Sequence, residues 1–184
     1  MTTWIIVAVV AVLLVGFIAL YNSLVRRRAQ VDNAWSQIDV QLRRRLDLIP
    51  NLVETVKGYA QFEKSTLDAV ISARQSAMTA APSPQAQASA DNMVSGALRQ
   101  LFALSEAYPD LKANQNFLSL QEQLAETESR VAYARQFYND EVLRLNTAIQ
   151  HFPTLIVARL FGFTEREYFD AGPEAQAPPK VSFS

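Results

Sequence analysis

The stretch RRRLDLIPNLVETVKGY, residues 43–59, decides how many helices the chain forms. It consists mostly of residues that fit a helix, but Pro50 stands in its middle. A proline inside a helix lacks the N–H that would bond the carbonyl four residues earlier, and its ring clashes with that carbonyl, at a cost of about 3 kcal/mol. Pro50 therefore ends one helix and begins another, or it bends a single helix.

Apolar residues recur at steps of three or four on both sides of Pro50, which predicts one buried helix face. This stripe contains Val31, Trp35, Ile38, Leu42, Ile49, Leu52, Val56 and Tyr59, and Arg45 interrupts it. The stripe keeps its phase across Pro50, as a kinked helix would. However, one helix over 25–77 would be about 80 Å long, against about 36 Å for a helix over 85–108. We therefore predict a helix corner at Pro50, where a first helical residue needs no N–H.

Two further connections divide the rest of the chain. Pro82 and Pro84 mark a linker, after which the helical pattern resumes by about Gln87. The tripeptide Tyr108-Pro109-Asp110 is a turn signal.

The last long helix has the clearest pattern. One alternating series of four-residue and three-residue steps contains Leu120, Leu124, Thr127, Val131, Ala134, Tyr138, Glu141, Leu145, Ala148 and Phe152. Asn114 or Asn116 is expected to cap the start of this helix, and Pro153 marks its end. Thr154 to Phe163 can form one more short helix.

The N-terminal segment is expected to anchor the chain in a membrane. Residues 4–20, WIIVAVVAVLLVGFIAL, contain no charge and cover about 26 Å as a helix. Trp4 and Tyr21 bracket this run, where aromatic rings prefer the headgroup level. A cleaved signal peptide is the competing interpretation, but basic residues before the run and a small-x-small site after it are both missing.

Three arginines predict the orientation of this anchor. Arg26, Arg27 and Arg28 follow the apolar run, and no Lys or Arg precedes it. The positive-inside rule then places the N-terminus outside and the remainder in the cytoplasm, at the inner cell membrane. The same arginines can hold anionic lipid headgroups.

The predicted fold is all-α, with a transmembrane helix followed by an antiparallel up-and-down four-helix bundle. Residues 1–25 form the anchor and residues 26–165 form the bundle. Residues 166–184 are rich in proline and are expected to form a flexible tail.

The residue types leave little room for catalysis. The chain has no cysteine and one histidine, His151, so thiolate metal sites and the two Glu-x-x-His motifs of a di-iron bundle are excluded. The isolated glycines exclude nucleotide-binding loops. Glu122, Glu126 and Glu128 are expected to face solvent or the basic cluster at residues 43–45. A Ser-Lys hydrolase stays open, but we expect no catalytic residue, metal or cofactor. A net charge of -1 gives no reason to expect nucleic acid as a partner.

Two polar groups are harder to explain by core packing. The first comprises Tyr108, Pro109, Asp110 and Asn114 at a bundle end, either as turn and capping residues or as a partner-binding loop. The second comprises Arg135, Tyr138, Asn139 and Asp140, which are expected to form a polar network that fixes helix register.

Several long motifs resemble the LemA family. They are YNSLVRRRAQVDNAWSQIDVQLRRRLDLIPNLVETVKGYAQFE, EAYPDLKANQNFLSLQEQLAETESRVAYARQFYNDEVLRLN and FPTLIVARLFGF, in this order, and the resemblance covers residues 20–170. It implies a membrane-anchored helical bundle and brings no enzymatic reaction or cofactor with it.

These features favour a non-enzymatic scaffold on the lipid bilayer that associates with copies of itself and organises or shapes the membrane. The alternative is an adaptor that docks onto another membrane protein, such as a protease or transporter, through the loop at residues 108–114.

Overall fold

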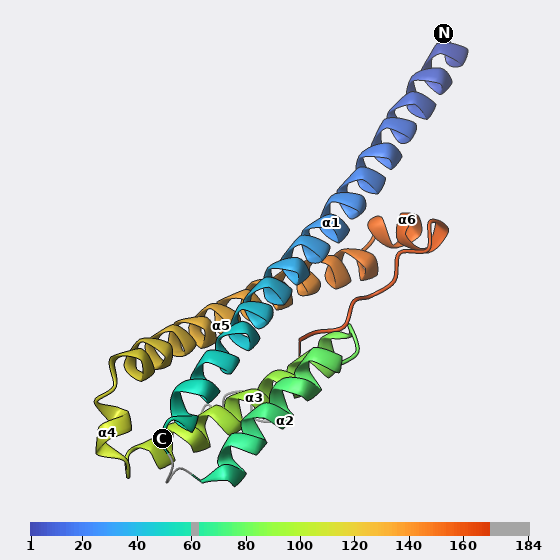
Figure 1. Ribbon diagram of the computed structural model, residues 1–184. Coiled ribbons are helices and arrows are strands. Elements are labelled where there is room, and N and C mark those ends of the chain that lie inside the picture. The colour runs from blue at the N-terminus through green and yellow to red at the C-terminus, as the bar shows by residue number, and fades with distance from the viewer. Residues whose placement is uncertain (60–62, 170–184) are drawn as a thin grey trace, which may run out of the picture. The chain divides into compact units, whose positions relative to one another are not determined.

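The computed structural model describes residues 1–59 and 63–169. All regular structure in this part of the chain is helical, as predicted (Figure 1). The helices are α1 (Thr2–Lys57), α2 (Lys64–Thr79), α3 (Pro84–Ser105), α4 (Pro109–Lys112), α5 (Gln115–Gln150) and α6 (Thr154–Leu160).

The chain divides into two compact units, and α1 and α5 contribute to both. Unit 1 comprises Met1–Gln37 and Gln136–Glu167, and unit 2 comprises Ile38–Arg135 and Tyr168–Ser184. The two units are described separately below.

The prediction of a helix corner at Pro50 is wrong, because α1 continues through Pro50 to Lys57. Pro50 has no N–H for the carbonyl of Leu46, four residues earlier. The side chain of Arg74 in α2 supplies the missing donor, with 3.0 Å between Arg74 Nε and Leu46 O. This hydrogen bond replaces the one that Pro50 cannot donate. The apolar stripe, which keeps its phase across Pro50, correctly indicated a single helix.

The core of unit 2 is built from α1, α2, α3, α4 and α5. Its buried residues are Ile49, Leu52, Val53 and Val56 of α1, Leu67, Val70 and Ala73 of α2, Val94, Leu98 and Leu101 of α3, Leu111 of α4, and Phe117, Leu120 and Leu124 of α5. The rings of Phe102 and Phe117 meet edge to face, with 5.9 Å between their centroids. Each large apolar side chain that leaves water here contributes about 1.5–3 kcal/mol.

Unit 1 buries the membrane-proximal part of the predicted stripe. Its buried apolar residues are Leu24, Val31 and Ala34 of α1, Tyr138, Val142, Leu145 and Ile149 of α5, and Val157 and Ala158 of α6. Trp35 is half-buried, and its ring centroid lies 5.5 Å from that of Tyr138. The predicted core faces of α1 and α5 are therefore largely confirmed.

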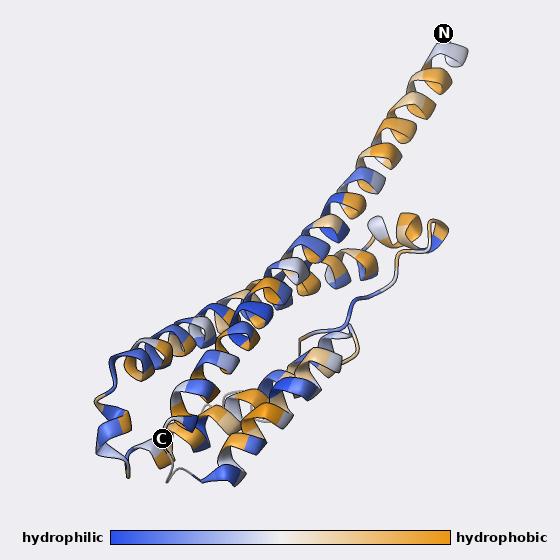
Figure 2. Cartoon of the chain, in the orientation of Figure 1, coloured by the Kyte–Doolittle hydropathy of each residue, from blue (hydrophilic) through white to orange (hydrophobic). Residues whose placement is uncertain are grey.

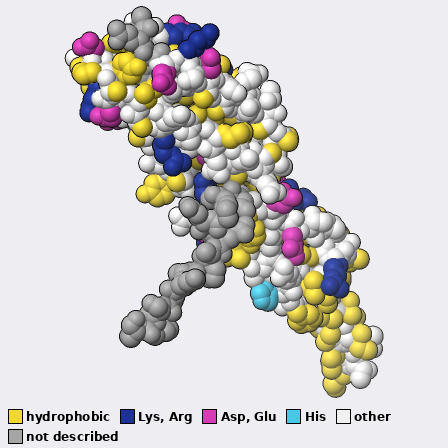
Figure 3. All heavy atoms as spheres, turned by 90° about the horizontal axis from the view of Figure 1, so that it is seen from below, with side chains coloured by type: hydrophobic (Ala, Val, Ile, Leu, Met, Phe, Trp, Pro, Cys, Tyr) yellow, Lys and Arg dark blue, Asp and Glu magenta, His cyan; other side chains and the backbone are white. Residues whose placement is uncertain are grey.

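The first part of α1 is apolar and exposed. Residues 4–20 carry no charge, and none of them is buried. Figure 2 shows this stretch as almost continuously hydrophobic, whereas the later turns of α1 alternate. Figure 3 shows that one end of the face in view carries hydrophobic side chains and no charged ones, whereas hydrophobic and charged side chains are mixed over the rest. This helix is long and apolar enough to cross a membrane.

Details at the helix ends refine the predictions. α3 ends at Ser105, before the predicted turn, and α4 forms a single helical turn over residues 109–112. Asn114 caps α5 as predicted, because its Oδ1 accepts a hydrogen bond of 3.1 Å from the backbone N of Phe117. Phe152 was predicted in the core stripe but is 79% exposed, because α5 ends at Gln150.

Two of the first four residues of the predicted tail, Arg166 and Phe169, make ordered contacts. Arg166 is held by hydrogen bonds to Asn146, and Phe169 is buried. The remainder of the predicted tail, residues 170–184, lies outside the described residues.

Candidate functional site

A cluster of aromatic rings in unit 1 joins α1 to the end of α6. We name Phe17, Tyr21, Arg28, Phe161 and Phe163 the boundary cluster. The centroid of the Phe161 ring lies 5.9 Å from that of Phe17 and 4.7 Å from that of Tyr21. The Phe163 ring lies 6.0 Å from that of Tyr21, and the guanidinium carbon of Arg28 lies 5.3 Å from the centre of the Phe163 ring.

The local sequence explains how two neighbouring phenylalanines reach α1. Gly162 has φ of +68°, the left-handed conformation that terminates many helices and that glycine adopts without strain. The backbone N of Phe163 then donates a 2.9 Å hydrogen bond to the carbonyl of Ala158, which closes the helix end. This turn places Phe161 and Phe163 on either side of Gly162, with both rings against Tyr21.

The structure places the five predicted membrane-interface residues on α1. Trp4, Arg26 and Arg28 are exposed, whereas Tyr21 and Arg27 are half-buried. Tyr21 and Arg28 belong to the boundary cluster. Their contact with lipid stays a prediction.

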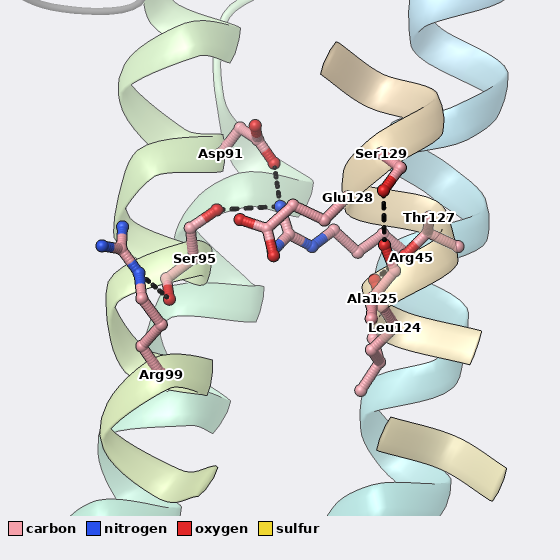
Figure 4. Close-up of polar contacts among 9 residues, drawn as sticks. All are labelled: Arg45, Asp91, Ser95, Arg99, Leu124, Ala125, Thr127, Glu128 and Ser129. Atoms are coloured by element: carbon pink, nitrogen blue, oxygen red, sulfur yellow. Dashed lines mark hydrogen bonds and ion pairs between the residues drawn. The ribbon is translucent and has the colours of Figure 1, made fainter. Parts of the chain in front are cut away.

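Unit 2 contains a charged cluster inside its apolar core. We name Arg45, Asp91, Ser95 and Glu128 the buried arginine site (Figure 4). Arg45 Nη1 donates to Asp91 Oδ1 at 2.7 Å and to Ser95 Oγ at 2.9 Å. Arg45 Nη2 lies 3.8 Å from Glu128 Oε2, so one of the three predicted outward-facing glutamates does reach the basic cluster.

Burial controls the electrostatics of this site. Arg45 is 2% exposed and Asp91 is 6% exposed, whereas the Glu128 side chain is 55% exposed. Burial raises the pKa of Asp91 above its usual range, and the adjacent Arg45 offsets only part of that effect. Arg45 Nε is buried without a hydrogen-bond partner. A small pocket beside the site is lined by Leu42, Arg45, Leu46, Ala77, Gln87, Ala90, Asp91 and Val94.

The buried arginine site links α1 to α3, and it is best explained as a structural feature. A buried ion pair gives modest net stability but is costly to break, so it specifies which faces of the two helices meet. The interruption of the apolar stripe at Arg45 was the one feature of the sequence that pointed to this site. Nothing in the sequence indicated that Asp91 and Ser95 would bind Arg45.

The predicted polar network over residues 135–140 has a different form. In unit 1, Tyr138 is buried, and its hydroxyl donates to the carbonyl of Glu167 at 2.8 Å, while Asp140 is exposed. Burial raises the pKa of this Tyr138 hydroxyl. In unit 2, the guanidinium carbon of Arg135 lies 5.5 Å from the centre of the Phe169 ring. Asn139 is half-buried.

Sequence reasoning missed a second polar contact to the segment after α6. Asn146 Nδ2 donates to the carbonyl of Arg166, and Asn146 Oδ1 accepts from the backbone N of Arg166, both at 2.9 Å. Arg166 also forms an ion pair with Asp32 of α1 at 2.9 Å. Asn146 and Tyr138 together hold the segment after α6 against α5.

Two residues of the predicted partner loop over residues 108–114 make contacts within the fold, and two others are exposed. Asn114 caps α5, and its Nδ2 donates to the hydroxyl of Tyr59 at 3.0 Å. Tyr108 packs against the core of unit 2. Pro109 and Asp110 are exposed.

His151 and Glu141 make local contacts with residues three or four positions away. His151 is exposed, with its Nδ1 2.8 Å from the carbonyl of Thr147. Glu141 is buried, and its Oε1 accepts from Arg144 at 2.7 Å. Within residues 1–59 and 63–169, no group of three or more His, Cys, Asp or Glu side chains is arranged to hold a metal ion.

Comparison with known proteins identifies the family of this chain. The sequence profile of the LemA family matches residues 34–183. The chain belongs to the LemA family.

Three relatives of known name are similar to the chain over most of its length. Magnetosome protein MamQ of Magnetospirillum gryphiswaldense is 24% identical over 86% of this chain and 67% of its own length. Magnetosome protein MamQ 2 of Paramagnetospirillum magneticum is 25% identical over 94% of this chain and 71% of its own. Protein LemA of Metamycoplasma hominis is 28% identical over 75% of this chain and 63% of its own. None of these names denotes an enzyme, and with the apolar helix they support a membrane-associated protein.

Proposed function

We propose that the protein is a non-enzymatic helical scaffold, anchored in the inner cell membrane by α1, which associates with copies of itself to organise or shape the bilayer. Its soluble part would be an antiparallel up-and-down bundle of α1, α2, α3 and α5. Its N-terminus would lie outside and the bundle would lie in the cytoplasm.

The observation that carries the anchor is the exposure of an uncharged helical stretch. Apart from the half-buried Phe17, the large apolar side chains from Trp4 to Ile18 are exposed. Their exposure to water is unfavourable, whereas their exposure to lipid is not. The same helix continues into the core of unit 2.

Exposed aromatic residues on α5 support self-association. Tyr133 and Phe137 are four residues apart, so they share one face of the helix, and they are 76% and 45% exposed. Leu143 lies further along α5 and is also exposed. Aromatic residues of this kind often form the centre of protein interfaces.

The oligomer size of the full-length protein in mild detergent tests this proposal. We expect a multimer in light scattering coupled to size exclusion. Tyr133→Glu and Phe137→Glu are expected to reduce its mass because each places a charge in the interface. Gln100→Glu is the matched control, since it adds a charge at an exposed position of α3, away from this face of α5. A monomeric wild-type particle would contradict self-association.

The alternative adaptor function rests on Pro109 and Asp110, which are exposed where α3 gives way to α5. An adaptor would lose a co-purifying membrane protein on Asp110→Lys while its helical content stays unchanged. Asp68→Lys is the control, because it makes the same change on the exposed face of α2. Tyr108 is unsuitable for this test because it packs against the core.

A further inference from the structure

The short helix α6 carries apolar residues on its outward side as well as on its packed side. Val157 and Ala158 are buried against the protein, as expected for a packed helix. The outward residues Ile156, Leu160 and Phe161 are nevertheless 56%, 68% and 50% exposed. A helix that is apolar on both sides needs a second apolar environment.

The boundary cluster fixes the depth of α6 relative to the anchor. Phe161 directly follows α6, and its ring contacts that of Phe17, which lies inside the apolar run of α1. Tyr21, the other ring in contact with Phe161, lies one residue beyond that run. At 1.5 Å per residue, Phe17 and Tyr21 are about 6 Å apart along the helix axis, on either side of the end of the apolar run.

Positive charges accompany this apolar surface. Arg159 is exposed on α6, and Arg26 and Arg28 are exposed on α1, one and two turns beyond Tyr21. Apolar side chains at one level and arginines just beyond them are the pattern of segments that lie in the headgroup region.

We infer that α6 lies in the headgroup region of the bilayer leaflet that α1 leaves, with Phe152, Ile156, Leu160 and Phe161 against the acyl chains. The occupant of this surface is lipid, because the surface is continuous with the exposed apolar face of the anchor through the boundary cluster. This inference rests on the proposed anchoring by α1. It adds a second lipid contact to the anchor, which would restrict rotation and tilt of unit 1 at the membrane.

Spin labels at single cysteines test the depth of α6 directly, since the chain has no cysteine of its own. The full-length protein would carry Leu160→Cys or, separately, Ile156→Cys, in vesicles of phosphatidylcholine and phosphatidylglycerol in equal amounts. Val10→Cys marks the anchor, and Leu118→Cys marks an exposed leucine of α5 in unit 2. Relaxation by oxygen, which concentrates in lipid, is compared with relaxation by a water-soluble nickel complex.

The expected result is that the labels at residues 160, 156 and 10 respond more to oxygen, and that the label at residue 118 responds more to nickel. Labels at residues 160 and 156 that match residue 118, while residue 10 still reports lipid, would overturn the inference and leave the anchor intact. Spin–spin broadening at residue 160 that disappears on dilution with unlabelled protein, with no preference for oxygen, would also overturn it, because a second copy would then cover α6. A label at residue 10 that reports water would overturn both the inference and the proposed anchoring.

Discussion

Arg74 Nε of α2 donates a hydrogen bond of 3.0 Å to the carbonyl oxygen of Leu46, which is the carbonyl that Pro50 leaves without a donor in α1. A helix with an internal proline has one unsatisfied carbonyl on the side of the ring. In this protein the unsatisfied carbonyl is the point at which a neighbouring helix is attached. Pro50 and Arg74 should therefore be energetically coupled.

Arg74→Met is expected to lower the free energy of unfolding by about 1 kcal/mol, because the Leu46 carbonyl is half-buried and loses its partner. In a Pro50→Ala background the backbone N–H of residue 50 can bond that carbonyl, so the same substitution should cost less than half as much. Urea unfolding of the four full-length proteins in detergent, followed by circular dichroism, measures the cycle. Strict additivity of the two substitutions would show that the proline and the arginine act independently.

The buried arginine site gives a prediction of larger magnitude. Arg45→Met should destabilise the protein by about 3–5 kcal/mol, because Asp91 is left buried without its partner. The double variant Arg45→Met/Asp91→Leu should recover most of this loss, since no buried charge remains. The same unfolding measurement checks both variants. If the double variant were as unstable as the single one, the loss would come from altered packing rather than from an unpaired charge.

The raised pKa of Asp91 predicts how its contribution to stability varies with pH. The folded protein holds the Asp91 proton more tightly than the unfolded chain does, for which the pKa is near 3.8. Protonation of Asp91 therefore stabilises the fold below that value, and this contribution is lost as the pH rises through the raised pKa. Relative to Asp91→Asn, which does not titrate, the wild type should gain stability as the pH falls from neutrality towards 4. Unfolding free energies of the two proteins at both pH values test this, and a change in the opposite direction would mean that Arg45 outweighs burial.

Asn146 should hold the segment after α6 in place. Asn146→Leu removes both hydrogen bonds to the backbone of Arg166, each worth about 1 kcal/mol. Trypsin should then cleave after Arg166 faster by a factor on the order of ten. Gln150→Leu, which removes an exposed hydrogen bond to Glu165, serves as the control and should change the rate little. Equal rates in the two variants would show that Asn146 does not restrain this segment.

The orientation of the anchor is tested by labelling from one side of the membrane. Thr3→Cys should react with a membrane-impermeant maleimide on intact spheroplasts, because the arginines that follow the apolar run favour the cytoplasm. Asp68→Cys, on the exposed face of α2, should react only after permeabilisation. The reverse pattern would place the soluble part outside.

Helical periodicity was sufficient to predict the all-α fold and most of the core. Val31, Ile38 and Leu42 of α1, and Leu124 and Val131 of α5, are buried as their spacing indicated. Such spacing indicates only which face of a helix is buried, and it can be read from residues close together in the sequence. The helix corner at Pro50 was predicted against this periodicity, because a single helix over residues 25–77 would have been much longer than a helix over residues 85–108.

The features that could not be predicted depend on residues far apart in the sequence. The donor that compensates Pro50 is Arg74, and the partner of Arg45 is Asp91, 46 residues away. Each pair is recognisable only once the fold brings its members together. The exposure of Phe152 has a different origin, since periodicity continues past the point at which Pro153 ends the helix.

The central claim is that the uncleaved chain is held in the membrane by the first part of α1 and assembles there with copies of itself. Native mass spectrometry of the full-length protein, extracted by mild detergent from alkali-washed membranes, tests this claim most directly. We expect a multimer whose dissociated subunit has the mass of the whole chain, 20.5 kDa. A monomer, or a subunit that has lost the apolar run at residues 4–20, would contradict it.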